Sequence, residues 1–435
     1  MRIPPKVMKR TDRPSARSPW AWIPTLYFAQ GLPYVAVMTI SVIMYKRLGL
    51  SNTDIALYTG WLYLPWVIKP FWSPFVDIIS TKRRWTLTMQ WLIGAAFAGI
   101  AFALPTPFFF SLTLAVFWLV GFTSATHDIA ADGYYMLALT EHQQSLYVGI
   151  RSTFYRIATV AGQGLLVILA GAIEESSGNI PFAWSVVFGI LSALFLIFAL
   201  YHSWALPKVE HPAGRSLSTV RDVWREFVEV FAEFFRKKQV GTAIVFMLLY
   251  RLPEAQLVKL INPFLLDPAT AGGLGLSTGQ VGVVYGTVGI IGLTLGGIIG
   301  GIVAARRGLK FWLRPMAWSM SLTCLTFVYL SFANAPSLPV INICIFIEQF
   351  GYGFGFTAYM LYLIYFSEGR HRTAHYSICT GFMALGMMLP GMAAGWIQET
   401  IGYQNFFLWT MVCCVATIGV TYLIRIDPAF GRKES

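Results

Sequence analysis

Charged side chains are scarce in this sequence. Asp, Glu, Lys and Arg together make up 12% of the 435 residues, whereas soluble domains carry roughly 25%. Such a low charge content excludes an ordinary soluble enzyme. Apolar and aromatic residues make up 56% of the chain, and this excess indicates a multi-pass membrane protein.

Motifs of metal, nucleotide and nucleophile chemistry are also missing. No HExxH, Walker or EF-hand loop occurs, which argues against ATP-driven pumping. Residues 275–279 spell G-L-S-T-G, but they lie in a loop with no preceding strand, so we reject a nucleophile elbow. The cysteines show no CxxC spacing and are expected to be small core residues: Cys324, Cys344, Cys379, Cys413 and Cys414. We expect no metal, no cofactor and no enzymatic activity.

Apolar segments long enough to cross a bilayer occur along the whole chain. A membrane helix needs about 20 residues, and backbone groups in lipid must be satisfied within helices or closed barrels. The apolar blocks are too long for barrel strands. We predict an all-α fold with twelve transmembrane helices, at 20–45, 54–78, 84–104, 109–136, 147–174, 181–204, 239–266, 277–304, 311–333, 336–366, 372–399 and 403–426.

Positive charges predict the orientation of these helices. The formal net charge is +12, and the basic residues gather in both terminal segments and in alternate loops. The positive-inside rule then places both termini and the central loop in the cytosol. Residues 2–19 are basic and Pro-rich, so no cleavable signal peptide is visible. The excess of positive charge is therefore topological and does not indicate nucleic-acid binding.

The two halves of the chain repeat each other. Leu32-Pro33 matches Leu252-Pro253, and residues 170–178 match residues 394–402. Two six-helix halves in tandem are typical of major facilitator transporters, in which pseudo-symmetric bundles rock about a central site. The expected order is a cytosolic N-terminal segment, a bundle, a cytosolic linker, a second bundle and a cytosolic tail: 1–19, 20–205, 206–238, 239–426 and 427–435.

Prolines and glycines suggest how the repeated helices bend and pack. Pro33 and Pro253 are expected to bend helices one and seven around a shared cavity and to serve in gating. Alternatively, both prolines simply survive from a duplicated ancestor. Five glycines in the eighth helix are spaced for close helix packing: Gly282, Gly286, Gly292, Gly296 and Gly300.

The linker contains an amphipathic segment between residues 216 and 238. Its apolar residues recur every three or four positions, which gives one apolar helical face. We expect this helix to lie on the cytosolic membrane surface. A soluble linker helix folded onto the loops remains the alternative.

A short list of ionisable side chains falls inside the predicted helices. Each costs roughly 2.5–3.5 kcal/mol on insertion scales, so those that remain usually face a cavity and have a function. The alternative is a set of structural ion pairs between helices. The list contains His127, four cations and four acids: Lys69, Asp128, Asp132, Arg156, Arg251, Glu254, Lys259 and Glu348.

Two of the acids share a face of helix four. Asp128 and Asp132 are four residues apart, and two close carboxylates in a low dielectric cannot both stay ionised cheaply. We favour Asp128 as the proton-coupling acid, while Asp132 has the alternative role of a cytosolic latch. Glu254 and Glu348 are next in line, and His127 is a further candidate because histidine titrates near neutral pH.

The substrate-binding candidates are mostly cations. Arg251 and Lys259 are predicted anion binders, because arginine offers bidentate recognition of carboxylate or phosphate and the repeat-equivalent positions in helix one are uncharged. Gln30, Tyr34, Lys69 and Arg156 complete the expected set. A self-neutralised Arg251–Glu254 bridge is the alternative. Other aromatic residues suited to sugar stacking are Tyr134, Tyr135, Phe154 and Tyr155.

Local strings resemble one family. Gln30-Gly31-Leu32-Pro33, the stretch from Lys69 to Asp77, Arg83-Arg84-Trp85, and the stretch from His127 to Tyr134 are similar to the AmpG-type muropeptide permeases and to the related acetyl-coenzyme A transporters. The resemblance spans the twelve-helix frame and is sharpest in the first four helices.

The resemblance implies proton-coupled import of anhydro-muropeptides, released in peptidoglycan turnover, across the bacterial inner membrane. It implies that Asp128 corresponds to the helix-four acid of the family. Family members more often have Gln at the position of His127, which leaves the exact substrate open. Asp77, Arg83 and Arg84 resemble the gating loop between helices two and three of facilitator transporters, although positive-inside topology also explains these arginines.

Other readings stay open. One is a carrier of acetyl-coenzyme A or another anionic metabolite, since cations suit phosphates as well as peptide carboxylates. Another is a sensor that keeps the fold but does not transport. The expected partners are a small sugar-peptide substrate, protons and the lipid bilayer, with the protein as a monomer and no nucleic acid.

Overall fold

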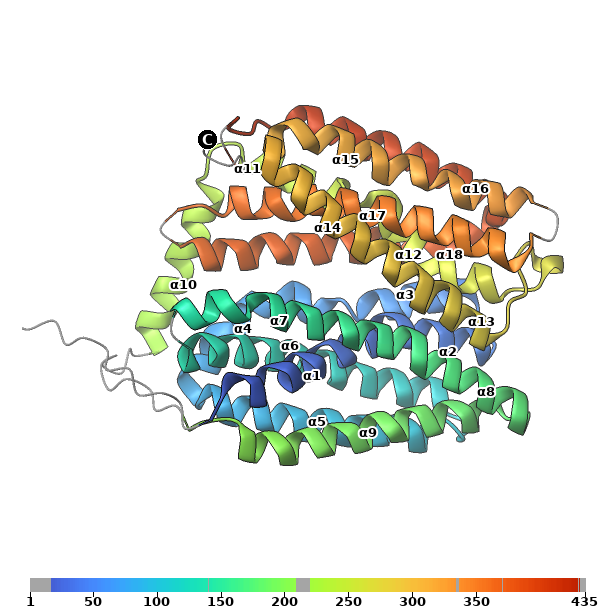
Figure 1. Cartoon of the computed structure of the whole chain (residues 1–435), viewed down its shortest axis with the longest axis horizontal. Helices are drawn as coiled ribbons and strands as arrows, with labels where there is room; N and C mark the ends of the chain where they lie inside the picture. The colour runs from blue at the N-terminus through green and yellow to red at the C-terminus, as the bar shows by residue number, and fades with distance from the viewer. Residues whose placement is uncertain are drawn as a thin grey trace, which may run out of the picture.

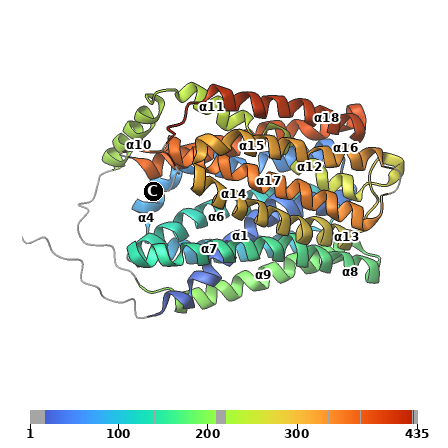
Figure 2. The same ribbon diagram turned by 45° about the horizontal axis from the view of Figure 1, so that its top comes forward.

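The chain folds into two helical bundles that lie side by side (Figure 1). The computed structural model describes residues 17–139, 141–208, 220–333, 336–369, 371–428 and 430, and within these ranges it contains helices and turns but no strand. Helix α10 (Val220–Phe235) crosses one end of both bundles. We call this the α10 end and the opposite one the distal end. In a view turned by 45°, α10 again lies at one end of the helices (Figure 2).

The N-terminal bundle contains spans 1 to 6. Span 1 is α1 (Ile23–Val35), the π-helical turn η2 (Ala36–Ile40) and α2 (Ser41–Arg47); span 2 is α3 (Asn52–Trp61) and α4 (Leu64–Ile79); spans 3 and 4 are α5 (Lys82–Ala103) and α6 (Phe109–Ala138); span 5 is α7 (Glu141–Val160), the π turn η3 (Ala161–Leu166) and α8 (Val167–Ser177); span 6 is α9 (Ile180–Ala205).

The C-terminal bundle contains spans 7 to 12. Span 7 is α11 (Val240–Leu249) and α12 (Leu252–Leu266); span 8 is α13 (Thr278–Val283), the π turn η5 (Val284–Gly289) and α14 (Ile290–Arg307); span 9 is α15 (Leu309–Thr323) and α16 (Leu325–Phe332); span 10 is α17 (Leu338–Phe366); spans 11 and 12 form α18 (Arg372–Leu423). Two 3-10 turns, η1 (Pro19–Ala21) and η4 (Ala269–Ala271), precede spans 1 and 8.

Length and composition support the twelve-helix fold. Nine helical stretches of the described residues are long and apolar enough to cross a membrane. One of them, Ala374–Leu423, holds two spans, because Gly402 (φ 77°) marks a turn within α18. Spans 2 and 7 are not among the nine; each consists of two helices shorter than 18 residues that a two-residue break separates. The predicted membrane fold of two six-helix bundles is confirmed.

The repeated sequence motif places a glycine at matching contacts between the bundles. A Cβ on Gly171 of α8 would collide with the backbone nitrogen of Gly279 in α13. A Cβ on Gly395 of α18 would likewise collide with the carbonyl oxygen of Asn52 in α3. Only glycine permits such close approach of two backbones. Spans 5 and 8, and spans 2 and 11, are thus held in direct backbone contact near the distal end.

The two matched prolines have different local structures. Pro33 lies inside α1, and the helix widens into the π turn η2 three residues later. Pro253 lies in the first turn of α12, after a break at Arg251 (φ −105°, ψ 17°). Proline lacks a backbone N–H, and this loss costs nothing in the first turn of a helix. The helix of span 7 is therefore interrupted at its proline, whereas the helix of span 1 continues through a π turn.

The glycines of span 8 are packing positions, as expected. A Cβ on Gly292 would lie 2.6 Å from the Phe346 carbonyl oxygen of α17, and Gly296 faces the next turn of that helix. Gly282 faces Ile168 of α8 instead, so the stripe serves both a neighbouring helix and the other bundle. The five cysteines are buried and free, which confirms their prediction as core residues.

Helix α10 is docked by part of its apolar face. Phe234 is fully buried and stacks on Phe382 at a centroid distance of 6.2 Å. At the end of the helix Lys237 Nζ donates to the Phe366 carbonyl oxygen at 2.6 Å, and partial burial lowers the pKa of this ammonium. The other half of α10 contacts the N-terminal bundle, where Phe71 of α4 lies 5.4 Å from the Phe231 ring.

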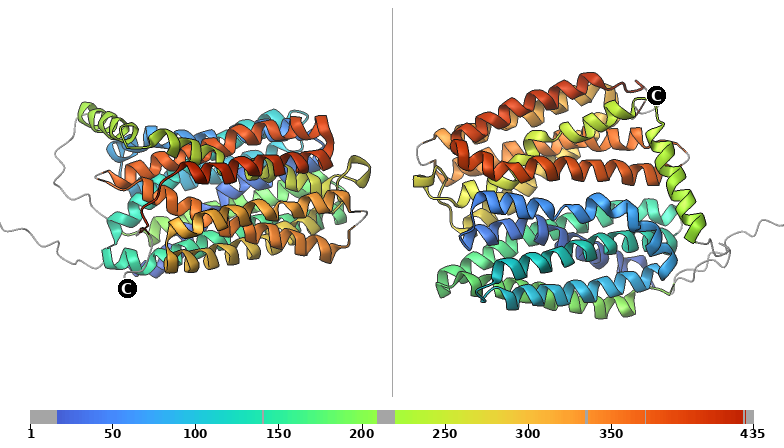
Figure 3. Two further views of the ribbon diagram at one scale, coloured as in Figure 1. Left: turned by 90° about the horizontal axis from the view of Figure 1, so that it is seen from above. Right: turned by 180° about the vertical axis from the view of Figure 1, so that it is seen from behind.

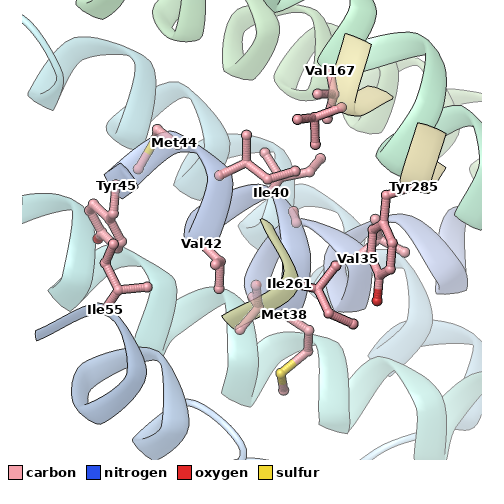
Figure 4. Close-up of a cluster of buried hydrophobic side chains, with 14 of the residues drawn as sticks. Val35, Met38, Ile40, Val42, Met44, Tyr45, Ile55, Val167, Ile261 and Tyr285 are labelled. Atoms are coloured by element: carbon pink, nitrogen blue, oxygen red, sulfur yellow. The ribbon is translucent and has the colours of Figure 1, made fainter. Parts of the chain in front are cut away.

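The main apolar core runs through both bundles. Figure 4 shows part of it, with Val35, Ile40 and Ile55 of the first two spans in one cluster with Ile261 of α12 and Tyr285 of η5. Predicted segments outside the described residues are most of the N-terminal segment (1–16), part of the linker (209–219) and the end of the tail (431–435).

Candidate functional site

Asp128 forms the N-terminal half of the candidate site. Lys69 Nζ of α4 lies 3.6 Å from Asp128 Oδ2 of α6, and the side chains are 26% and 16% exposed. The indole Nε1–H of Trp66 donates to the same oxygen at 3.3 Å. Gln30 of α1 lies beside this carboxyl group. Three helices thus converge on one acid, and its charge is balanced by a lysine at a distance too long for a strong hydrogen bond.

Asp132 has a separate cation. Arg151 Nη2 of α7 lies 3.1 Å from Asp132 Oδ1, and the Tyr27 hydroxyl donates to the same oxygen at 3.1 Å. The Arg151 guanidinium also lies over the rings of Tyr27 and Tyr135, at 4.5 and 5.0 Å. Each helix-four acid is therefore compensated by its own cation, whereas the sequence suggested that the two carboxylates compete with one another.

Arg251 and Glu254 form the C-terminal half of the site. Arg251 donates to both oxygens of Glu254, at 2.7 Å from Nε and 3.0 Å from Nη2. Its Nη2 also donates to the Tyr352 hydroxyl of α17 at 2.8 Å. The bidentate pair is the self-neutralised bridge that was the alternative in the sequence. It forms because the break before α12 places the arginine one turn away from the glutamate.

Tyr34 lies between the two halves. Its ring packs edge-on against Trp66 of α4 at 5.3 Å, and its hydroxyl is within electrostatic range of Asp128 on one side and of Arg251 and Glu254 on the other. Tyr63 of span 2 lies beside the same hydroxyl. Tyrosines offer both an apolar ring and a hydrogen-bonding hydroxyl. This arrangement suits a ligand with sugar rings or amides.

Lys259 is a buried cation that joins the bundles. Its side chain is held by α12, and Nζ donates to Thr59 Oγ1 of α3 at 2.9 Å. The ammonium also lies 5.1 Å from the centre of the Tyr63 ring. Lys259 is 1% exposed, and no acid pairs with it among the described residues. Its charge is therefore met only by a hydroxyl and an aromatic face.

Two further predicted residues also lack an ionic partner. Glu348 of α17 is 3% exposed, and its one described donor is the neighbouring Gln349 amide at 2.8 Å. Arg156 of α7 is exposed, and its guanidinium lies across from Gly297 of α14 in the other bundle. No hydrogen bond or ion pair of Arg156 occurs in the described part of the chain. Arg156 is thus free to bind an anion.

His127 points into the N-terminal bundle. Its Nε2 lies 3.0 Å from the Gln90 amide of α5, and Gln90 Oε1 lies 2.9 Å from Nδ1 of His202 in α9. His202 Nε2 in turn lies 2.9 Å from the Thr25 hydroxyl of α1. This buried chain ties four spans together. It matches the alternative in which His127 only bonds to a neighbouring helix.

Polar contacts between the bundles gather at the distal end. Lys46 Nζ of α2 lies 2.6 Å from Asp267 Oδ1 after α12. The Asn52 amide donates to Gln398 at 2.7 Å and to the Tyr403 hydroxyl at 2.9 Å. We call these five residues the distal latch. Nearby, Thr278 of α13 donates to Glu174 of α8 at 2.6 Å, and Glu399 accepts from the Thr53 backbone at 3.1 Å.

The predicted gating arginines lie at the α10 end. Arg83 Nε donates to the Leu206 carbonyl oxygen at 3.0 Å, and its guanidinium also reaches the Ser203 carbonyl, so this side chain caps the end of α9. Arg84 is exposed. The side chain of Asp77 lies outside the described residues, so the predicted acid of this latch has no structural account.

No group of three or more His, Cys, Asp or Glu side chains that could hold a metal ion occurs among the described residues.

The residues that bring the charges together were absent from the predicted site: Thr59, Tyr63, Trp66, Arg151, Tyr352 and the distal latch. Arg151 lies four residues from the predicted start of span 5, where a charge costs little, so it was not counted. The aromatic partners carry no signal in a chain with 16% aromatic residues.

Comparisons with known proteins agree with this architecture. The family model of the Major Facilitator Superfamily matches residues 25–364. The AmpG 4 protein of Rickettsia conorii is 26% identical over 90% of this chain and 93% of its own length. The anhydromuropeptide permease of Escherichia coli is 25% identical over 94% of this chain and 80% of its own length.

Solved structures share the fold. A bacterial homologue of the human lysosomal transporter Spinster, in an inward-facing and unoccupied conformation, has a TM-score of 0.71 at 16% identity over 93% of this chain and 96% of its own. A D-xylose-proton symporter has a TM-score of 0.70 at 12% identity over 94% and 97%. With its two six-helix bundles and charged interface, the chain is a multi-pass membrane transporter that belongs to the Major Facilitator Superfamily, and in sequence it is related to the AmpG-type transporters within it.

Proposed function

We propose that this protein is a proton-coupled symporter that imports anhydro-muropeptides across the bacterial inner membrane. The observation that carries the proposal is the Lys69–Asp128 pair, which lies at 3.6 Å in the N-terminal bundle and within range of Tyr34 at the bundle interface. The names of the sequence relatives supply the substrate class. The positive-inside rule supports cytosolic termini, with the α10 end in the cytosol.

In this mechanism Asp128 alternates between Lys69 and a proton. A proton taken up from outside neutralises the carboxylate, which frees the ammonium of Lys69 for an anionic group of the substrate. A peptide carboxylate is such a group. Release of substrate and proton to the cytosol lets the pair form again. The exchange is cheap because a pair at this distance lacks a strong hydrogen bond.

The substrate would bridge the two bundles. Lys69 and Arg156 offer cations from the N-terminal bundle, while Arg251, held by Glu254 and Tyr352, offers one from the other bundle. The tyrosine rings near Tyr34 would contact the sugars. Closure of the distal latch supports a state that faces the cytosol, in line with the inward-facing fold relative.

Transport in proteoliposomes tests the proposal. An inward pH gradient should drive accumulation of labelled anhydro-muropeptide, and a protonophore should abolish it. Asp128→Asn should lose uphill uptake while substrate binding persists, because the amide keeps the shape of the carboxyl group but does not take up and release a proton near neutral pH. Asp132→Asn is the matched control on the same helix and should retain coupling. If Asp128→Asn still accumulates substrate, the coupling role moves to Glu254 or Glu348.

A carrier of acetyl-coenzyme A or another anionic metabolite is the second candidate. Arg156 and Lys259, which have no acidic partner among the described residues, favour it, because phosphates bind to cations as readily as carboxylates do. Unlabelled acetyl-coenzyme A that competes with muropeptide uptake would support this reading. Absence of any uptake by a protein that binds muropeptide would instead identify a sensor.

A further inference from the structure

Lys259 lies in the closed region between the candidate site and the distal latch. Arg251 of the candidate site directly precedes α12, Asp267 of the distal latch directly follows it, and Lys259 is eight residues from each. Since a helix rises 1.5 Å per residue, Lys259 is about 12 Å along the axis from both. Its side chain is 1% exposed, so it is open to neither end in this conformation.

Groups of the opposite bundle cover this ammonium. The Thr59 hydroxyl donates to the Ile55 carbonyl oxygen at 2.6 Å, so it only accepts from Lys259 Nζ. The Tyr63 ring lies on another side of the nitrogen, at 5.1 Å. The rear view in Figure 3 shows span 2, in blue, alongside the orange-red α18 at the boundary between the bundles. Both contacts of Lys259 cross this boundary, so opening of the distal end breaks them.

A second polar side chain of α12 lacks a hydrogen bond. Asn262 is 1% exposed, its Oδ1 is buried, and it has no partner in the part of the chain that the structure describes. It follows Lys259 by three residues, which makes the two side chains neighbours on the helix. By contrast, Gln256 accepts from the indole of Trp409 within the C-terminal bundle at 2.9 Å. Buried polar groups are nearly always bonded, so Asn262 indicates a partner that binds in another conformation.

The two side chains together match a carboxylate next to a peptide group. An ammonium binds a carboxylate strongly, and an amide side chain both donates to and accepts from a peptide. Arg251 is already engaged by both oxygens of Glu254, whereas no described acid neutralises Lys259. An incoming anion therefore meets no competing carboxylate at Lys259.

Tyr63 connects Lys259 with the candidate site. It lies beside the Tyr34 hydroxyl, which is within electrostatic range of Arg251 and Asp128. A carboxylate bound to Lys259 is thus one aromatic ring away from the candidate site. Closure of the distal end returns Thr59 and Tyr63 to Lys259, and this return displaces the bound group toward Tyr34.

We propose that Lys259 and Asn262 form an outer binding site for a carboxylate group, available only while the distal end is open. The ammonium binds the carboxylate, and the Asn262 amide bonds to the adjoining peptide group. The identity of the ligand, a muropeptide, and the side from which it arrives rest on the proposed function. The anion site itself does not.

Charged thiol reagents test the site. Thr59→Cys places a thiol beside Lys259, while the five native cysteines are buried. The purified protein, alone and combined with Lys46→Gln to weaken the distal latch, is treated with an anionic or a cationic methanethiosulfonate. Each rate is divided by that of a free thiol in water. One cation within about 5 Å should then favour the anionic reagent about tenfold.

Lys259→Met should abolish this preference, because methionine has a similar length but no charge. Lys259→Gln gives the same comparison if the methionine variant does not fold. Gln256→Leu is the matched control on the same helix and should keep the preference. Absence of labelling in both Thr59→Cys proteins, equal relative rates of the two reagents, or a preference that persists without Lys259 would overturn the site.

Protection from labelling identifies the ligand. Anhydro-muropeptide with free carboxyl groups should slow the labelling of Thr59→Cys, and its fully amidated form should slow it much less. Asn262→Leu should keep the charge preference but lose most of the protection. An anion preference without protection by muropeptide would support the site and contradict the proposed substrate, so the two proposals fail separately.

Discussion

Removal of Lys46 should open the distal end. Lys46 Nζ lies 2.6 Å from Asp267 Oδ1, and both side chains are 14% exposed. The two residues belong to different bundles, so the contact exists only when the bundles meet at this end. In Lys46→Gln, Asp267 keeps the Tyr403 hydroxyl at 2.7 Å but loses its cation.

The magnitude follows from the burial of the pair. Breaking a fully buried pair costs about 3–5 kcal/mol, and breaking an exposed one costs about 0–1 kcal/mol. This pair is mostly buried and Asp267 retains a donor, so we take about 2 kcal/mol. The closed-to-open ratio at the distal end should then fall roughly 30-fold.

Pulsed electron spin resonance on a doubly labelled protein measures this ratio. Spin labels at Ser176 and Thr270 lie on exposed distal positions of opposite bundles. Lys46→Gln should increase the population with the longer distance. The reversed pair Lys46→Asp/Asp267→Lys should restore the short distance, because the attraction is the same with the charges exchanged.

Arg47→Gln is the matched control. Arg47 Nε lies 3.0 Å from Glu174 Oε2 at the same end, and both residues belong to the N-terminal bundle. Glu174 also accepts from Thr278 of the other bundle, but this contact does not use Arg47, so the loss of Arg47 should change the distance distribution much less than the loss of Lys46. If Lys46→Gln leaves the distribution unaltered, or if Arg47→Gln shifts it equally, the latch does not control opening.

Three further outcomes are expected. Gly395→Ala places a Cβ against the Asn52 carbonyl oxygen and should reduce uptake at least tenfold, whereas Gly419→Ala, whose Cβ meets open space, should have no effect; normal uptake by Gly395→Ala would contradict the backbone contact. Lys259→Met removes a buried cation that has no acidic partner in the described part of the chain and should raise the Tm in thermal unfolding, while weakening substrate binding; a lower Tm would contradict the burial argument. His127→Leu removes a bundle-internal hydrogen bond and should lower the Tm by a few degrees without changing the pH profile of uptake; a shifted profile would place His127 in the proton path.

The membrane fold and its duplication could be predicted because they depend on patterns along the chain. Apolar runs of sufficient length can only be spans, and matched strings such as Leu32-Pro33 and Leu252-Pro253 report a repeat. The scarce charges also identified Asp128 and Arg251 as site candidates. Their partners could not be derived, because pairing depends on the rotation and break of each helix. The local break before Pro253, for example, turns Arg251 back onto Glu254.

The distal latch was invisible for another reason. Lys46, Asn52 and Asp267 lie at span ends, where polar residues are ordinary and carry no penalty. In the sequence they served only to orient the chain. Their role depends on which bundle each belongs to and on how the bundles meet, and that is a property of tertiary structure alone.

The glycine contacts between the bundles have an energetic consequence. Where Gly171 meets Gly279 and Gly395 meets Asn52, backbone touches backbone, so parting the bundles there uncovers almost no side-chain surface. Burial of apolar side chains between membrane helices also stabilises their contact little, because the lipid tails are as apolar as the side chains. These two contacts therefore add little apolar stabilisation to the closed state, so the polar contacts of the distal latch carry more of its preference. A preference that depends on a few polar contacts can be shifted by the binding energy of one small ligand and one proton.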